Sequence, residues 1–103
     1  MLEIPLIATP AQQINTVLNN QDMTIAVYEK TDPLYGTNIY IDVAKDGVAL
    51  ITGQIVVINT PLVPANSGLA GNIYAIDLDG QDEPQTSGLG TRWLLIYAED
   101  SEL

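Results

Sequence analysis

The sequence contains no cysteine and no histidine, and only three of its 103 residues are basic. Without cysteine it forms no disulfide, zinc–thiolate or iron–sulfur site. Without histidine it lacks the usual general base and the commonest metal ligand. The three serines that lie in polar segments therefore have no imidazole to activate them. An enzyme is the least expected class of function.

Positive charge is equally scarce. The only basic residues are Lys30, Lys45 and Arg92. The chain has 13 acidic residues, so its net charge is −10. Because lysine and arginine supply most nucleic-acid affinity, and because an acidic surface repels phosphates, we expect no direct binding to nucleic acid or anionic lipid. No apolar run approaches the roughly 18 residues that span a bilayer. The N-terminal segment carries Glu3 where a signal peptide would be basic.

Hydrophobic residues make up 47% of the chain and follow a period of two rather than a helical period. Met23, Ile25 and Val27, for example, alternate with small or polar neighbours. The length predicts one domain over residues 1–103, ending in a short acidic tail at 99–103. Strands are predicted at about 22–30, 38–43, 48–51, 55–58, 73–78 and 93–98. The last of these is almost continuously apolar, which predicts burial on both faces.

Turn-forming residues separate these strands. Residues 31–36 predict a hairpin loop, and residues 45–47 predict a tight Asp-Gly turn. Gly53 predicts a bulge or a sheet corner. Residues 14–18 could start a short helix, but a hairpin with 22–30 is favoured. Residues 59–72 and 79–90 predict loops. The fold class is therefore all-β, a single small antiparallel β-sandwich or partly closed β-barrel.

Four carboxylates gather around Gly80: Asp77, Asp79, Asp82 and Glu83. They are weak candidates for a calcium site, because their spacing does not match the EF-hand loop and a solvated Asp-Gly turn explains them. Asp42 and Asp77, on different predicted strands, could in principle form the carboxylate pair of a hydrolase. Polar positions on a half-exposed sheet explain both more simply. We therefore predict no metal, no cofactor and no catalytic residue.

Two tyrosines fall on the polar side of neighbouring strands. If Ile25 and Ile41 point inward, Tyr28 and Tyr40 point outward. Such residues usually form a cross-strand pair, although they could also stack a sugar or fill a partner's pocket. Under either interpretation this face is a candidate partner-contact surface.

The region from Gly71 to Tyr97 carries a family resemblance. A strand ending in Ile-Asp-Leu-Asp-Gly precedes the acidic loop Gln81-Asp82-Glu83-Pro84, and the segment Leu-Gly-Thr-Arg-Trp-Leu-Leu-Ile-Tyr follows at 89–97. This pattern resembles the small plug or hub-associated baseplate proteins of contractile-tailed bacteriophages. The opening Glu-Ile-Pro-Leu at 3–6 and Tyr-Ile-Asp-Val at 40–43 are similar to that family as well.

The resemblance implies a non-enzymatic structural component of the virion, made in the host bacterial cytoplasm and placed at the hub or plug of the tail baseplate. Its partners would be other baseplate proteins (hub, spike, tube or wedge) or further copies of the same chain. The alternative is a free-standing calcium- or carbohydrate-binding β-module. An acidic wall would also hold passing DNA poorly, because like charges repel.

Arg92 and Trp93 are the remaining candidate partner contacts. Arginine and tryptophan are enriched among residues that dominate interfaces. Arg92 could instead form a bidentate pair with Asp77 or Asp79 and tie the long loop to its own strand. The intramolecular pair is favoured.

Overall fold

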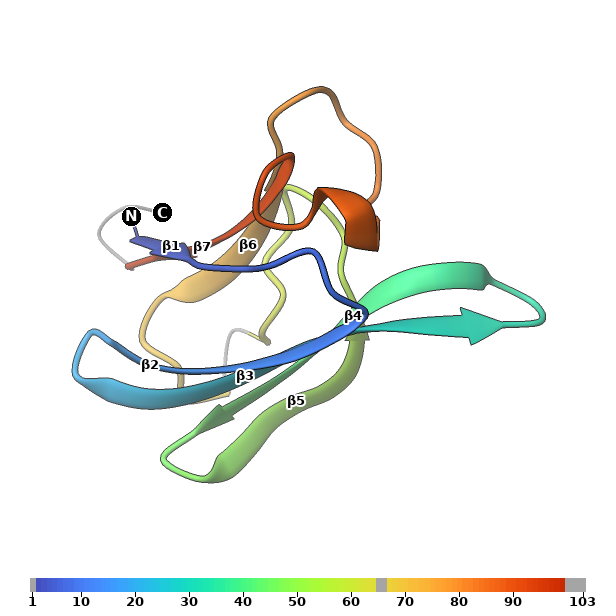
Figure 1. The fold of residues 1–103 in the computed structure, drawn as a ribbon. Helices are drawn as coiled ribbons and strands as arrows, with labels where there is room; N and C mark the ends of the chain where they lie inside the picture. Colours follow the sequence, from blue (N-terminus) through green and yellow to red (C-terminus); the bar gives the residue numbers. More distant parts are fainter. Residues whose placement is uncertain (1, 65–66, 100–103) are drawn as a thin grey trace.

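The computed structural model describes residues 2–64 and 67–99, and within them the chain forms two antiparallel sheets (Figure 1). One sheet has the strand order β1-β7-β6, and the other has the order β2-β3-β4-β5. The strands are β1 (Leu2–Ile4), β2 (Ala11–Leu18), β3 (Gln21–Asp32), β4 (Gly36–Lys45), β5 (Val48–Ile55), β6 (Asn72–Asp77) and β7 (Trp93–Ala98). A short 3-10 helix, η1, covers Thr86–Gly88.

The four-stranded sheet is a meander, whose connections include the predicted hairpin loop at 31–36 and the predicted Asp-Gly turn at 45–47. Two tight turns connect its strands: Asn19 and Asn20 between β2 and β3, and Asp46 and Gly47 between β4 and β5, all with positive φ. Asn, Asp and Gly tolerate this conformation, which type I′ hairpin turns require. Residues 14–18 lie within β2, so they form a strand and not the short helix that the sequence left open.

Strand β5 is irregular where a bulge was predicted. Its pairing with β4 moves from Ile41↔Gln54 to Val43↔Ile51, so one extra residue of β5 lies in that interval, which includes Gly53. Gly53 has a φ of +67°, a conformation that a side chain would strain. A second shift follows before Ala44.

The predicted strand at 55–58 is wrong, because β5 ends at Ile55 and the chain then crosses to the other sheet. Ile58 forms an isolated parallel bridge with Ala75, and the Leu62 N–H donates to the Ile73 carbonyl. Strand β1 and helix η1 were not predicted.

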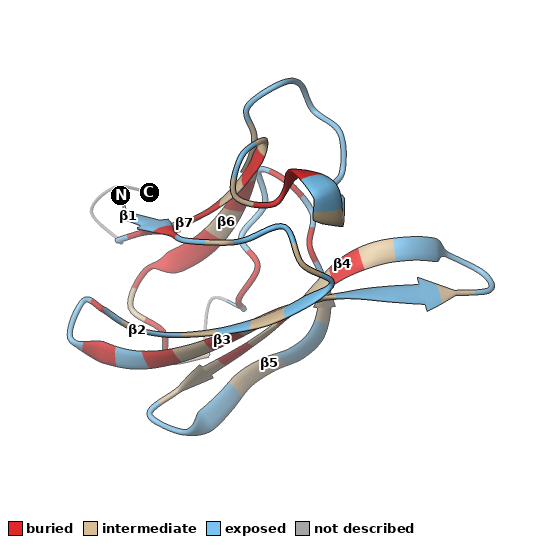
Figure 2. Cartoon of the chain, viewed as in Figure 1, coloured by how far each residue is buried: buried red, intermediate tan, exposed pale blue. Residues whose placement is uncertain are grey.

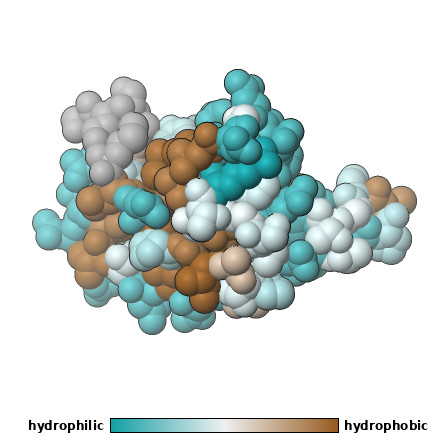
Figure 3. All heavy atoms as spheres, turned by 45° about the horizontal axis from the view of Figure 1, so that its top comes forward, coloured by the Kyte–Doolittle hydropathy of each residue, from teal (hydrophilic) through white to brown (hydrophobic). Residues whose placement is uncertain are grey.

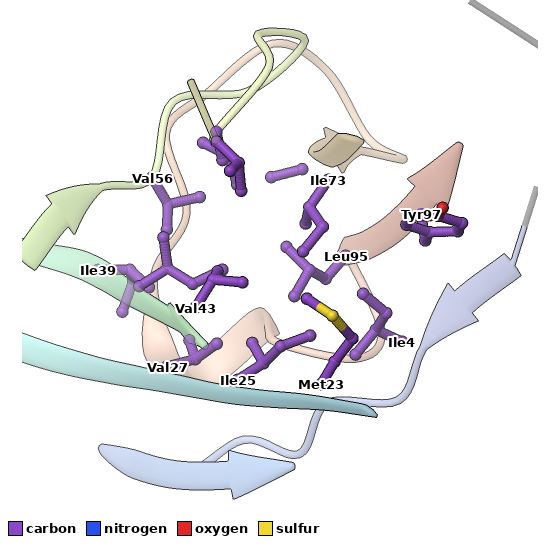
Figure 4. Close-up of a cluster of buried hydrophobic side chains, with 14 of the residues drawn as sticks. Ile4, Met23, Ile25, Val27, Ile39, Val43, Val56, Ile73, Leu95 and Tyr97 are labelled. Atoms are coloured by element: carbon purple, nitrogen blue, oxygen red, sulfur yellow. The ribbon is translucent and has the colours of Figure 1, made fainter. Parts of the chain in front are cut away.

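The core lies between the two sheets (Figure 4), and the predicted β-sandwich is confirmed, without closure into a barrel. Alternate residues of β3 and β4 point inward against β7 and β6, as their period of two predicts. The central side chains include Ile25, Val27, Ile41, Val43, Ile73, Leu95 and Tyr97. The prediction that β7 is buried on both faces is correct for one face only. Trp93, Leu95 and Tyr97 are buried, whereas Leu94 and Ile96 on the other face are half-buried.

The loop at 59–72 packs onto this core. Leu62, Val63 and Leu69 are buried. Two buried amide side chains satisfy its backbone: Asn72 bonds both the N–H and the carbonyl of Val63, and Gln21 bonds the N–H and the carbonyl of Ala70. Buried polar groups paired in this way fix one path for the loop.

Burial stops part-way along the β3–β4 hairpin, and its outer half projects from the body (Figure 2). The molecule measures 36 × 26 × 21 Å along its principal axes. No helix in the described residues is long and apolar enough to cross a membrane. Apart from Glu99, the predicted acidic tail at 99–103 lies outside the described residues.

Candidate functional site

The connection between β6 and β7 is organised by a single arginine. Asp77 ends β6 opposite Trp93, the first residue of β7, so the antiparallel pair brings Asp77 close to Arg92. Arg92 donates from Nε to Asp77 Oδ1 at 2.8 Å and from Nη2 to Asp77 Oδ2 at 2.9 Å. Nη2 also donates to Asp82 Oδ2 at 2.8 Å. The favoured intramolecular pair is therefore present, as a bidentate fork.

The Asp77 carboxylate also shapes the start of this loop. It accepts the backbone N–H groups of Asp79 and Asp82, both at 2.9 Å, and its side chain is fully covered. Hydrogen bonds from Arg92, followed by those backbone donors, hold the pKa of Asp77 well below its usual range. The same bonds, first from Asp77 and then from Asp82, raise the pKa of Arg92.

Trp93 completes this group. The Arg92 guanidinium carbon lies 4.4 Å from the centroid of the indole ring, a cation–π geometry. The indole Nε1 donates to the Asp82 carbonyl at 3.0 Å. Trp93 is only 4% exposed, and a Cβ at Gly88 would overlap its ring. Asp77, Asp82, Arg92 and Trp93 are called the Arg92 cluster below.

The acidic residues singled out as weak calcium candidates have separate roles in this arrangement. Asp77 and Asp82 bind Arg92, while Asp79 and Glu83 lie exposed in the loop. Among the described residues, no group of three carboxylate, histidine or cysteine side chains is placed to hold a metal ion. The hydrolase alternative is not supported either, because Asp42 lies on the other sheet from Asp77 and bonds Tyr28.

Tyr28 and Tyr40 form the expected cross-strand pair. They are directly opposite in the β3–β4 register, with ring centroids 6.1 Å apart and planes inclined by 18°. The Tyr28 hydroxyl donates to Asp42 Oδ1 at 2.8 Å, and the Gly53 N–H donates to the same oxygen at 2.7 Å. Burial, followed by the hydrogen bond to Asp42, raises the pKa of Tyr28. The Lys30 Nζ lies 5.4 Å from the Tyr40 ring centroid.

The end of the β3–β4 hairpin, here called the hairpin tip (residues 32–36), lies in the predicted hairpin loop but was not among the predicted contact residues. Leu34 and Tyr35 are 84% and 73% exposed, and Figure 3 shows hydrophobic surface at the far end of the projection. Asp32 Oδ1 accepts the N–H groups of both residues, at 2.7 and 3.3 Å. Two apolar side chains between turn formers in a predicted loop were the available signal.

Side chains next to the tip brace it further. The Asn38 Nδ2 donates to the Tyr35 carbonyl at 2.9 Å, and the hydroxyls of Thr31 and Thr37 bond across the hairpin at 2.8 Å. At the base of the hairpin, Thr86 donates to Glu29 Oε1 at 2.9 Å and connects η1 to β3. Hydrogen bonds thus brace the backbone of the tip, while its own apolar side chains stay exposed.

Comparison with known proteins adds one finding. Residues 1–100 match the family model described as "Cyanophage baseplate Pam3 plug gp18". No curated protein matches the chain. The match covers both sheets, the hairpin tip and the Arg92 cluster, and the family is a structural one, so the protein is a non-enzymatic component of the virion that has other baseplate proteins as partners. The chain belongs to the phage baseplate plug family represented by the cyanophage Pam3 plug.

Proposed function

We propose that this plug protein sits at the tail axis of the baseplate and contacts the hub and spike proteins there. The observation that carries the proposal is the match of residues 1–100 to the plug family. A plug must be held by its surroundings, so its contact surface should combine apolar area with a fixed shape. The chain offers both at the hairpin tip and on the adjoining face of Tyr28 and Tyr40.

The hairpin tip is suited to enter a pocket of a partner. Leu34 and Tyr35 are exposed, and Asp32 and Asn38 already order the backbone that presents them. Since little conformational entropy remains to be lost, more of the contact energy appears as affinity. Aromatic and aliphatic side chains in a fitted pocket are the usual anchors of an interface.

The other candidate contacts differ in what they can reach. Tyr28 and Tyr40 are half-buried and present their stacked rings on the outer face of the sheet. The Arg92 side chain is 30% exposed, whereas Trp93 is buried beneath it. We therefore propose that Arg92, rather than Trp93, touches the partner, as part of the preformed Arg92 cluster.

Charge indicates which surfaces would accept the protein. With a net charge of −10, it favours neutral or basic partner surfaces. The same charge repels DNA, so a plug of this composition does not retain a genome that passes along the tail. Exposed aspartates and glutamates that take no part in the Arg92 cluster, such as Asp79 and Glu83, contribute to this field.

The test compares two double variants in tails purified from the source phage. Leu34→Ser with Tyr35→Ser removes the apolar tip, and Val48→Ser with Leu78→Ser removes similarly exposed residues elsewhere. Mass spectrometry measures copies of the chain relative to the tube protein. We expect the copy number of the tip variant to fall about tenfold or more, which requires a loss of at least about 1.4 kcal/mol of binding free energy, while the control stays at the wild-type level. Equal incorporation of the tip variant and the control variant would show that the tip is not part of the contact surface. Absence of the wild-type chain from mature tails would overturn the whole proposal.

A further inference from the structure

Strand β2 is an edge strand of the four-stranded sheet, and no other strand within residues 2–64 and 67–99 pairs with its outer side. Glu29 donates its N–H to the Pro10 carbonyl, which fixes the alternation of the β2–β3 ladder: even-numbered β2 residues bond β3. The backbone groups of the odd-numbered residues therefore point away from the sheet. These residues are Ala11, Gln13, Asn15 and Val17. Their side chains are exposed on the outer face.

The other three sheet edges are each protected. Residues 58–62 cover β6 through hydrogen bonds to Ala75 and Ile73. Strand β5 is broken by two register shifts and Gly53, and β1 has three residues, one of them Glu3. Bulges, charges, short length and covering segments are the usual defences against edge pairing. In contrast, the eight residues of β2 contain no charge, proline or glycine, and the strand pairs in unbroken register.

We infer that β2 is an interaction surface whose partner is β2 of a second copy, paired antiparallel about a two-fold axis at Ile14. In this register Gln13 lies opposite Asn15 of the second copy, and Ala11 lies opposite Val17. Every outward N–H and C=O between Ala11 and Val17 then has a partner. No other antiparallel register of these four residues pairs all of them.

The side chains are self-complementary in the same register. On the outer face, amide meets amide at the centre and aliphatic meets aliphatic at the ends. On the inner face, Ile14 meets its own copy, and Gln12 meets Thr16. An isologous contact requires this kind of match between a surface and itself. It also joins the two acidic molecules along a strand that carries no charge.

This inference concerns the free protein and does not depend on where the plug sits in the baseplate. Sedimentation of the full chain over a concentration series should show a monomer–dimer equilibrium. Added salt should strengthen the dimer, because it screens repulsion between two chains of charge −10. A monomer at all concentrations, or a ring of three or more copies, would overturn the inference.

A charge test uses two double variants of equal net charge. Gln13→Glu with Asn15→Asp places carboxylates at the centre of the paired strands, where like charges lie opposite each other. Gln81→Glu with Gln85→Glu makes the same chemical change in an exposed loop. We expect the dimer dissociation constant to rise about tenfold or more in the first variant and less than about twofold in the second. Equal effects would contradict pairing through β2.

A cross-linking test fixes the register. The protein has no cysteine, so a single introduced thiol can pair only with its own copy. Ile14→Cys lies on the proposed axis and should form a disulfide-linked dimer under mild oxidation. Thr16→Cys is its control, since Thr16 faces Gln12 of the second copy and should cross-link poorly. Efficient cross-linking of both variants, or of Thr16→Cys alone, would overturn this register. Far-UV circular dichroism establishes that each variant is folded.

Discussion

The β3–β4 and β6–β7 connections both begin with an aspartate at a strand end, but they differ in whether the loop packs onto the body of the protein. Asp32 ends β3 and accepts the N–H groups of Leu34 and Tyr35; Asp77 ends β6 and accepts those of Asp79 and Asp82. In each case a carboxylate at a strand end shapes the turn that follows.

The two loops differ in whether the aspartate also binds a cationic side chain. Asp77 also binds Arg92, whose guanidinium covers Trp93, so the long loop folds back onto the body. Asp32 has no such partner among the described contacts, and its hairpin tip stands free with its apolar side chains in solvent. The carboxylate sets local geometry, while the neighbouring arginine and tryptophan decide whether a loop contributes to stability or is available for recognition.

The largest difference in stability is expected between alanine variants of two aromatic residues, Trp93 beside the β6–β7 loop and Tyr35 in the hairpin tip. Trp93→Ala should lower the free energy of unfolding by about 3–5 kcal/mol, because a buried indole is lost and a cavity remains. Tyr35→Ala should change it by less than about 0.5 kcal/mol, because its ring is exposed. Urea unfolding followed by circular dichroism measures both, and Trp93→Phe gives an intermediate value if Trp93→Ala does not fold. Similar losses at Trp93 and Tyr35 would break the comparison.

A smaller effect is expected at the two carboxylates. Asp77→Asn removes the charge that faces Arg92 and should lower Tm by about 5 °C or more. Asp32→Asn keeps an oxygen that can accept the same backbone bonds, so its Tm should change by about 1 °C or less. Differential scanning calorimetry at neutral pH compares them. If Asp32→Asn proved as harmful as Asp77→Asn, Arg92 would not be what distinguishes the two loops.

The effect of Asp77→Asn on stability should also depend on pH. The folded protein depresses the pKa of Asp77 below the ordinary value of 3.8. Its contribution to stability is therefore complete above pH 3.8 and is lost as the pH falls further toward the depressed value. The difference in unfolding free energy between wild type and Asp77→Asn should shrink below about pH 4. A difference that grows with acidity would contradict the assigned ion pair.

The smallest expected effect is that of calcium. Each oxygen of Asp77 already accepts one bond from Arg92 and one from the backbone, so the loop has little to offer a cation. Millimolar calcium should leave Tm unchanged, since only ligands that bind the native state raise it. A rise of several degrees would restore the metal-binding interpretation of Asp77, Asp79, Asp82 and Glu83.

The sequence predicted those features that local chemistry determines. Alternation from Met23 to Val27 marked a strand, and Asp46-Gly47 marked a tight turn, because side-chain period and positive φ are properties of a few adjacent residues. The pair of Asp77 with Arg92 was also accessible, since both flank predicted strands. Its second carboxylate, Asp82, was not, because the path of the intervening loop depends on the packing of Trp93.

Long-range contacts account for what was missed. Leu2–Ile4 has too few residues for a pattern and is a strand only because β7 pairs with it. Ile58 lies in an apolar run that continues β5 in sequence, yet it bonds Ala75 of the other sheet. The exposure of Leu34 and Tyr35 depends on how far β3 and β4 extend past the core. Apolar residues among turn formers mark this segment in the sequence, but they do not show how far it projects.

The pairing of β1 with β7 has a consequence for the order of folding. The β2–β5 meander closes through short turns, so it can form while the chain is still being made. The three-stranded sheet joins Leu2 to Tyr97 and needs both ends of the described chain at once. A ribosome-released fragment lacking β7 would leave the meander with one uncovered apolar face, a natural substrate for proteolysis. The core between the two sheets is therefore complete only after the last strand has paired with β1.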